Sequence, residues 1–138
     1  MTASSTLHTR LVGDSTDSLL RFALRLDATL SGLAGVGIAA FANPVAELTG
    51  ITPTAGYVLG AAFVAYGVVV YSLAALPVLR RAGLAVITAN TAYTLGAILV
   101  VAEGVVPLTG AGVAACLGSA AYTAAFAVLQ YLGVRRLA

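Results

Sequence analysis

The residue with the clearest capacity for chemistry is Asp27, in the segment LRLDATLSG at residues 24–32. It stands near the start of a long apolar run built mainly from Leu, Ala, Gly and Val. An ionised aspartate inside a membrane costs about 2.5–3.5 kcal/mol at the helix centre on insertion scales, so it requires a partner. Two roles follow: a structural ion pair, or a carboxylate that exchanges a proton with a substrate or ion.

The helical positions around Asp27 indicate where a partner must come from. Arg25 is two residues away and points to nearly the opposite side, whereas Ser31 and Ala34 share the face of Asp27. We expect this small-residue face to look into a helix bundle, within a turn or two of the cytoplasmic surface. The candidate ion-pair partners are arginines of other segments at that surface: Arg80, Arg81, Arg135 and Arg136.

A second candidate site is a layer of polar side chains near the middle of the apolar runs. Counted at about 1.5 Å of rise per residue, these side chains lie at similar depth. They are Tyr66, Asn90, Tyr93, Thr94, Tyr122 and Thr123. One explanation is interhelical hydrogen bonding that fixes the packing, at about 0.6 kcal/mol per contact in membranes. The other is a small cavity for a lipid chain, a quinone or a drug.

Other catalytic chemistry lacks the residues it needs. Cys116 is the only cysteine, which excludes an intramolecular disulfide and a C-x-x-C motif. His8 is the only histidine and lies in a polar N-terminal segment, away from any metal centre in the apolar runs. G-x-S-x-G, P-loop and H-E-x-x-H motifs are also missing from the sequence. We therefore expect no enzymatic activity, no metal and no cofactor.

The elements that position these residues follow from the composition. The chain of 138 residues is 60% hydrophobic and 9% charged, whereas a soluble domain is about a quarter charged. Four stretches reach the roughly 20 apolar residues that a helix needs to cross a bilayer. They run over about residues 24–42, 56–79, 82–102 and 108–134. Because lipid cannot pair free backbone groups, the sequence predicts an all-α transmembrane four-helix bundle.

The N-terminal region precedes this bundle as a polar extension. We predict a flexible cytoplasmic tail over residues 1–14 and a single domain over residues 15–138, with helix from about Ser15. Asp17 and Arg21 are four apart and share a helix face.

Charge distribution predicts the orientation of the bundle. All seven basic residues are arginines, and they precede the first run, join the second to the third, or follow the fourth. The opposite connections carry Glu47 and Glu103 and no basic residue. The positive-inside rule then places both termini in the cytoplasm. The net charge of +2, without a basic run, argues against a nucleic-acid partner.

Two outer connections resemble each other. Residues 46–56 read AELTGITPTAG and residues 102–112 read AEGVVPLTGAG, and LRLDA before the first run is echoed by LRRAG before the third. The pattern indicates two duplicated helical hairpins of the same orientation. Chance agreement between Ala/Gly-rich segments is the alternative.

Small residues also recur at helical spacing, as helix contacts in membranes require. Such stripes favour tight packing within the chain, or contact with another subunit if one of them faces outward. They comprise Gly56 and Gly60; Ala85, Ala89, Ala92 and Gly96; and Gly110, Ala114 and Gly118.

Three segments together resemble a group of small four-helix integral membrane proteins common in actinobacteria, similar in general shape to the DoxX-like proteins. These are LRLDA, the Pro-containing turn NPVAELTGI, and the Q-x-x-G-x-R-R ending formed by Gln130, Gly133, Arg135 and Arg136. The resemblance implies a bacterial inner membrane and carries over no catalytic residue.

The sequence favours a non-enzymatic accessory or scaffolding subunit of a larger or homo-oligomeric membrane complex. Its partners would be the lipid bilayer and another membrane protein or a second copy. The alternative is a small oligomeric transporter, or a lipid- or quinone-binding protein, that uses the polar layer and Asp27 and takes a hydrophobic small molecule.

Overall fold

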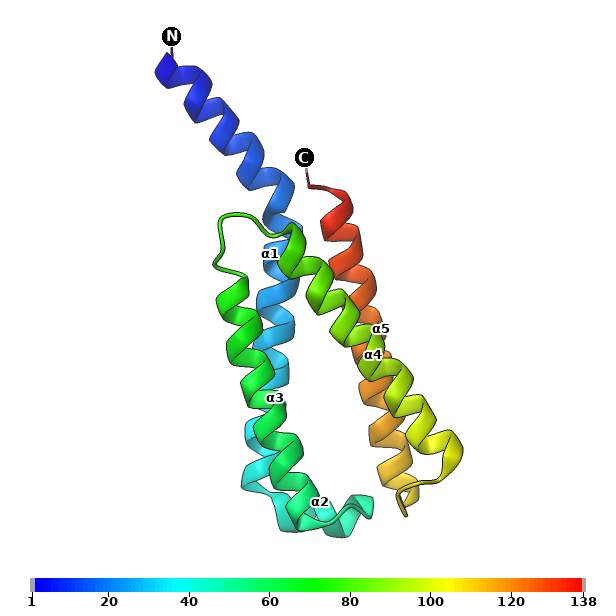
Figure 1. Cartoon of the computed structure of the whole chain (residues 1–138). Coiled ribbons are helices and arrows are strands. Elements are labelled where there is room, and N and C mark those ends of the chain that lie inside the picture. Colours follow the sequence, from blue (N-terminus) through cyan, green and yellow to red (C-terminus); the bar gives the residue numbers. More distant parts are fainter. Residues whose placement is uncertain (1, 138) are drawn as a thin grey trace.

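The computed structural model describes the backbone of residues 2–137 and the side chains of residues 16–137. Its elements are α1 (Thr2–Ala40), α2 (Ala42–Thr49), α3 (Pro53–Leu73), α4 (Arg80–Glu103) and α5 (Gly110–Arg135), and Figure 1 shows their arrangement. Four of these helices are long and apolar enough to cross a membrane, and α2 is the short exception. The protein is an all-α, multi-pass membrane protein, as the composition predicts.

The four long helices form two antiparallel pairs. α1 packs mainly against α3, and α4 mainly against α5, while α1 also contacts α5. Both pairs begin at the end of the bundle that holds the termini, here called the terminal end, and run toward the end formed by α2 (Figure 1). The same orientation of the two hairpins fits the predicted repeat, and their origin by duplication stays a prediction.

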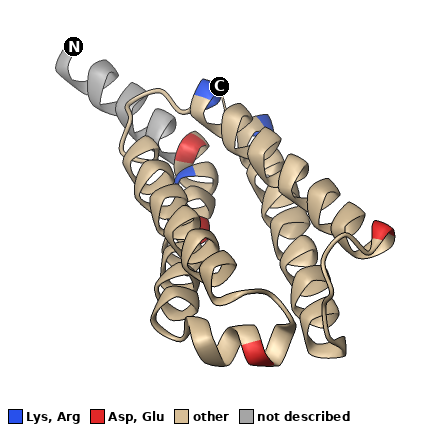
Figure 2. Ribbon diagram, turned by 60° about the horizontal axis from the view of Figure 1, so that its bottom comes forward, with Lys and Arg blue, Asp and Glu red and all other residues tan. Residues whose placement is uncertain are grey.

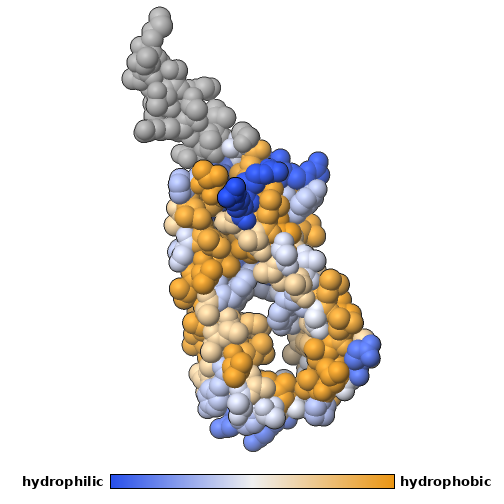
Figure 3. Space-filling view, in the orientation of Figure 1, coloured by the Kyte–Doolittle hydropathy of each residue, from blue (hydrophilic) through white to orange (hydrophobic). Residues whose placement is uncertain are grey.

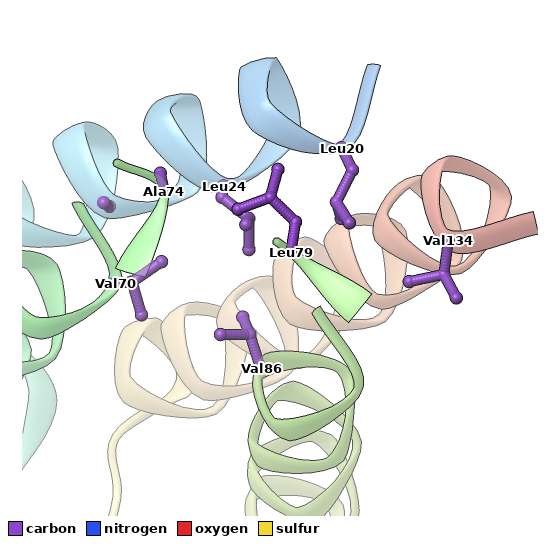
Figure 4. Close-up of a cluster of buried hydrophobic side chains, with 8 residues drawn as sticks. Leu20, Leu24, Val70, Ala74, Leu79, Val86 and Val134 are labelled. Atoms are coloured by element: carbon purple, nitrogen blue, oxygen red, sulfur yellow. The ribbon is translucent and has the colours of Figure 1, made fainter. Parts of the chain in front are cut away.

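The terminal end is closed by an apolar cluster. Leu20 and Leu24 of α1 are fully buried, and they meet side chains from both hairpins and from the connection between them (Figure 4). The partners drawn there are Val70, Ala74, Leu79, Val86 and Val134. Burial of these side chains joins the two hairpins at this end.

Glycines set the spacing between α1 and α3. A Cβ at Gly35 would lie 2.6 Å from the carbonyl oxygen of Gly60, and one at Gly60 would lie 2.6 Å from the carbonyl oxygen of Gly35. The two backbones therefore touch, which only residues without a side chain permit. The Gly56–Gly60 stripe packs inside the chain, with Gly56 against Ala42.

The other two small-residue stripes are exposed and are not packed against another helix of the chain. Gly96, Gly110 and Gly118 have open space where a Cβ would be. The alanines of the same stripes, Ala85, Ala89, Ala92 and Ala114, are exposed. These stripes of α4 and α5 do not provide the tight packing within the chain that their spacing suggests.

Three helix boundaries differ from those expected. The second span ends at Leu73 rather than Leu79, because Pro77 lacks a backbone N–H and disfavours helix before it. The first connection folds into α2, which ends at Gly50 with φ of 87°. The backbone of α1 is helical from Thr2 rather than from about Ser15. The side chains of residues 1–14 lie outside the described residues, so the flexibility expected for this segment stays a prediction.

The end formed by α2 joins the two hairpins by backbone contacts. The Thr109 amide donates to the Thr49 carbonyl at 3.0 Å, and the Thr109 hydroxyl donates to the Leu48 carbonyl at 2.6 Å. The hairpins are thus connected at both ends of the bundle.

Candidate functional site

Asp27 is fully buried, and its carboxylate accepts five hydrogen bonds from neutral side chains. Oδ2 accepts from the Tyr66 hydroxyl at 2.7 Å, from Asn90 Nδ2 at 3.0 Å and from Gln130 Nε2 at 2.8 Å. Oδ1 accepts from the Ser31 hydroxyl at 3.1 Å and from the Tyr122 hydroxyl at 3.2 Å. Each of the four long helices thus supplies at least one member of this group, which we call the Asp27 network.

Further bonds connect the donors to one another. Asn90 Nδ2 also donates to Gln130 Oε1 at 2.9 Å, and the hydroxyls of Ser31 and Tyr122 lie 3.2 Å apart. No buried side-chain nitrogen or oxygen in the described part of the chain lacks a partner. A fully satisfied polar network of this kind fixes a single arrangement of the helices around it.

The rest of the predicted polar layer lies beside the Asp27 network, between α4 and α5. Thr94 and Thr123 place their hydroxyl oxygens 2.6 Å apart between α4 and α5. The Tyr93 hydroxyl donates to Ser119 at 2.9 Å across the same pair of helices. The six residues of the predicted layer therefore divide into a group that contacts Asp27 and a group that links α4 to α5.

The structure differs from the expected ion pair between Asp27 and Arg80, Arg81 or Arg135. Among the described side chains, no arginine contacts Asp27, and the salt bridge present joins Arg21 to Asp17 at 2.9 Å, as their spacing predicts. The reason is depth: Asn90, which bonds Asp27, lies ten residues after Arg80 (80 to 90), or about 15 Å along the helix.

The arginines instead gather at the terminal end, while the acidic residues of α2 and the end of α4 lie at the opposite end (Figure 2). Arg80 and Arg81 are exposed. The guanidinium carbon of Arg135 lies 5.9 Å from the ring centroid of Tyr131. Arg21 donates to the Ala74 carbonyl and, at 3.1 Å, to the Leu76 carbonyl, so it satisfies free carbonyls at the end of α3.

A cavity of about 360 Å³ lies beside the Asp27 network, between the two hairpins. Each long helix contributes three lining residues: Leu30, Ser31 and Ala34; Ala62, Phe63 and Tyr66; Ala89, Asn90 and Tyr93; and Ser119, Tyr122 and Thr123. Four of these residues donate to Asp27, so the carboxylate lies directly behind the cavity wall.

The cavity is open to the sides of the bundle. Figure 3 shows gaps between the two hairpins that pass through the molecule, bordered by paler, less hydrophobic residues than the outer faces. α3 and α4 barely contact each other, and Ala62 and Ala89, which line the cavity, are exposed. In a bilayer, these gaps would face the lipid rather than water.

Sequence reasoning missed Gln130 as a member of the site. Gln130 is fully buried and donates to Asp27, although it lies nearer the end of its span than the predicted layer. Its signal was available: a glutamine in an otherwise apolar run needs a buried partner. Phe63 and Ser119 were also missed, and nothing in the sequence distinguishes them from ordinary helix residues.

The described residues contain no group of three or more His, Cys, Asp or Glu side chains placed to hold a metal ion. The arrangement instead offers hydroxyls, an amide, aromatic rings and a carboxylate behind them. These groups can hydrogen-bond and orient a small molecule.

Comparison with known proteins gives no relative, since no family model, curated protein or solved structure matches the chain. The resemblance to DoxX-like proteins stays a prediction.

Proposed function

We propose that this protein binds a hydrophobic small molecule inside the membrane, in the cavity between its two hairpins. The observation that carries the proposal is the cavity itself, which is lined by all four spanning helices and backed by the Asp27 network. Ligand pockets are mostly apolar with a few placed polar groups, and they start at about 300 Å³. This cavity, about 360 Å³ in volume, matches both features.

Its lateral gaps support entry of the ligand from the lipid. A membrane-soluble molecule would reach the cavity between α3 and α4, past Ala62 and Ala89, without crossing water. The protein would act without catalysis, as a binding protein or as the binding unit of a small transporter.

The test uses native mass spectrometry after gentle purification from the membrane of its host. Ala62→Phe fills the cavity from α3, and Ala61→Phe is its matched control, because Ala61 is exposed and is not among the lining residues. We expect a bound small molecule in the wild type and in Ala61→Phe, and its loss in Ala62→Phe. Equal retention by both variants, or no bound molecule in the wild type, would contradict the proposal.

A second candidate is the accessory subunit that the composition favours. The observation in its support is that Gly96 of α4 and Gly118 of α5 are exposed, with open space where a Cβ would be. Such surfaces allow close approach of a helix from another subunit. Gly96→Leu together with Gly118→Leu should dissociate such a complex in detergent, whereas cavity variants should leave it intact.

We also propose a bacterial inner-membrane location with both termini in the cytoplasm. The support is the placement of the arginines at the terminal end and the preference of basic residues for that side. Cysteines introduced at Arg81 and Glu103 in a Cys116→Ala background should label from opposite sides of the membrane.

A further inference from the structure

We infer that the cavity selects hydrophobic cations, an inference that rests on the proposed function and specifies its ligand class. The first step is charge. Asp27 bears the one acidic group among the described residues that is buried, and no arginine of the described chain is close enough to neutralise it. The lining residues themselves carry no formal charge. A cavity backed by a carboxylate attracts a cation and repels an anion.

The second step is the form of the carboxylate. Both oxygens accept hydrogen bonds, three on Oδ2 and two on Oδ1. Hydroxyl and amide donors of this number stabilise negative charge without cancelling it, because each donor is neutral overall. The negative charge of Asp27 is therefore stabilised by hydrogen bonds but not neutralised by an arginine, so it can attract a cationic ligand.

The third step is the chemistry of the cavity wall. Four aromatic rings line the cavity, those of Phe63, Tyr66, Tyr93 and Tyr122. Phe63 and Tyr93 stand edge to face, with ring centroids 5.9 Å apart, and they come from α3 and α4. Aromatic faces attract cations, more strongly in sites without water, and aromatic sites commonly bind quaternary ammonium groups.

Size and access agree with this class. A quaternary ammonium group attached to one phenyl ring fits within about 360 Å³, and its apolar body allows it to enter through the lipid-facing gaps. The carboxylate stands behind Ser31, Tyr66, Asn90 and Tyr122, one side chain away from the cavity. At this separation, a single charge pair in a medium of intermediate polarity changes affinity by about tenfold or more.

The experiment compares two probes of the same shape that differ by one charge. They are phenyltrimethylammonium, a permanent cation, and tert-butylbenzene, its neutral isostere. Binding of each is measured by equilibrium dialysis against full-length protein in nanodiscs of zwitterionic phosphatidylcholine, and binding to empty nanodiscs is subtracted. We expect the cation to bind about tenfold or more tightly than the neutral probe.

Asp27→Asn keeps the shape of the side chain and removes its charge. We expect it to reduce binding of the cation to the level of the neutral probe, so that the preference for the cation is lost. Phe63→Leu is a second variant, which leaves the hydrogen bonds of the Asp27 network in place. It should weaken binding of the cation several-fold more than binding of the neutral probe. An unchanged preference in both variants would overturn the inference.

The outcomes also separate this inference from the proposed function. If both probes bind the wild type equally and Ala62→Phe blocks both, the cavity binds ligands but does not select cations, and the inference fails alone. If neither probe binds, the proposed function fails with it.

Discussion

The Asp27 network makes a sharp prediction about two substitutions of the same residue. In Asp27→Asn, the side-chain oxygen can take the place of Oδ2 and accept from Tyr66, Asn90 and Gln130. Its amide then points to the hydroxyls of Ser31 and Tyr122, which can accept as well as donate. In Asp27→Ala, the acceptor is gone. We therefore expect Asp27→Asn to fold with nearly the stability of the wild type and Asp27→Ala to lose stability.

The loss of stability expected for Asp27→Ala depends on which hydrogen-bond donors keep another acceptor when the carboxylate is removed. Tyr66 keeps Asn90 Oδ1 at 3.3 Å, and Tyr122 keeps the Asp27 carbonyl at 3.2 Å. Gln130 Nε2 and one hydrogen of Asn90 Nδ2 are left without an acceptor, and both residues are buried. At about 1–3 kcal/mol for each orphaned donor, the loss is about 2–6 kcal/mol. Because contacts in membranes average about 0.6 kcal/mol, the lower end is the better expectation.

Reversible unfolding in mixed micelles with increasing SDS measures both variants, with helix content followed by circular dichroism. The expected result is a loss of about 2 kcal/mol for Asp27→Ala and less than about 1 kcal/mol for Asp27→Asn. Equal destabilisation by the two variants would refute the reasoning, because the charge of Asp27 would then hold the fold together. Equal stability of Asp27→Ala and the wild type would show that the network contributes nothing.

Two further predictions test the packing around the site. Gly60→Ala should separate α1 from α3 and lower the free energy of unfolding by about 1–3 kcal/mol, since its Cβ would lie 2.6 Å from the Gly35 carbonyl oxygen. Gly96→Ala, with open space at that position, should leave the free energy of unfolding unchanged in the same assay. Arg21→Gln should cost about 1 kcal/mol, because it removes the ion pair with Asp17 and a charged donor at the Ala74 carbonyl. An unchanged free energy of unfolding in Gly60→Ala would contradict the close contact between α1 and α3. An unchanged value in Arg21→Gln would contradict a stabilising role for the contacts of Arg21.

The class of fold was predictable because lipid leaves the chain few choices. Runs of about 20 apolar residues must be helices, and arginine placement separates their two ends. The exact end of α3 was harder to predict, since Leu79 continues the apolar run and is buried even though Pro77 has already ended the helix. Burial and helix content are separate properties, and hydropathy reports only the first.

The residues of the site were easier to predict than the hydrogen bonds between them. Depth along each span identified Tyr66, Asn90 and Tyr122, but it could not show which helix faces turn inward. The Asp27 face was predicted correctly to look into the bundle, with Ser31 on it. Its depth was underestimated, because α1 extends well before Leu24 and places Asp27 level with Asn90. An ion pair with an arginine at the terminal end would be expected only for a residue that lies closer to that end than Asp27 does.

The repeat between the hairpins gives the last reason to regard Asp27 as more than a packing residue. The offset that aligns residues 46–56 with 102–112 also aligns Tyr66 with Tyr122, and both hydroxyls donate to Asp27. Under the predicted duplication, the two tyrosines occupy equivalent positions of the two hairpins. The same offset places Gly83 at the position of Asp27, and Gly83 is buried. The match of LRLDA with LRRAG is one residue out of this frame.

Asp27 places a carboxylate inside the membrane, at a cost of a few kcal/mol for its charge. The five surrounding donors offset this cost, and four of them also line the cavity. This carboxylate supports the fold through its hydrogen bonds, and it also lies behind polar residues of the cavity wall, which is the position that the proposed binding of a cation requires.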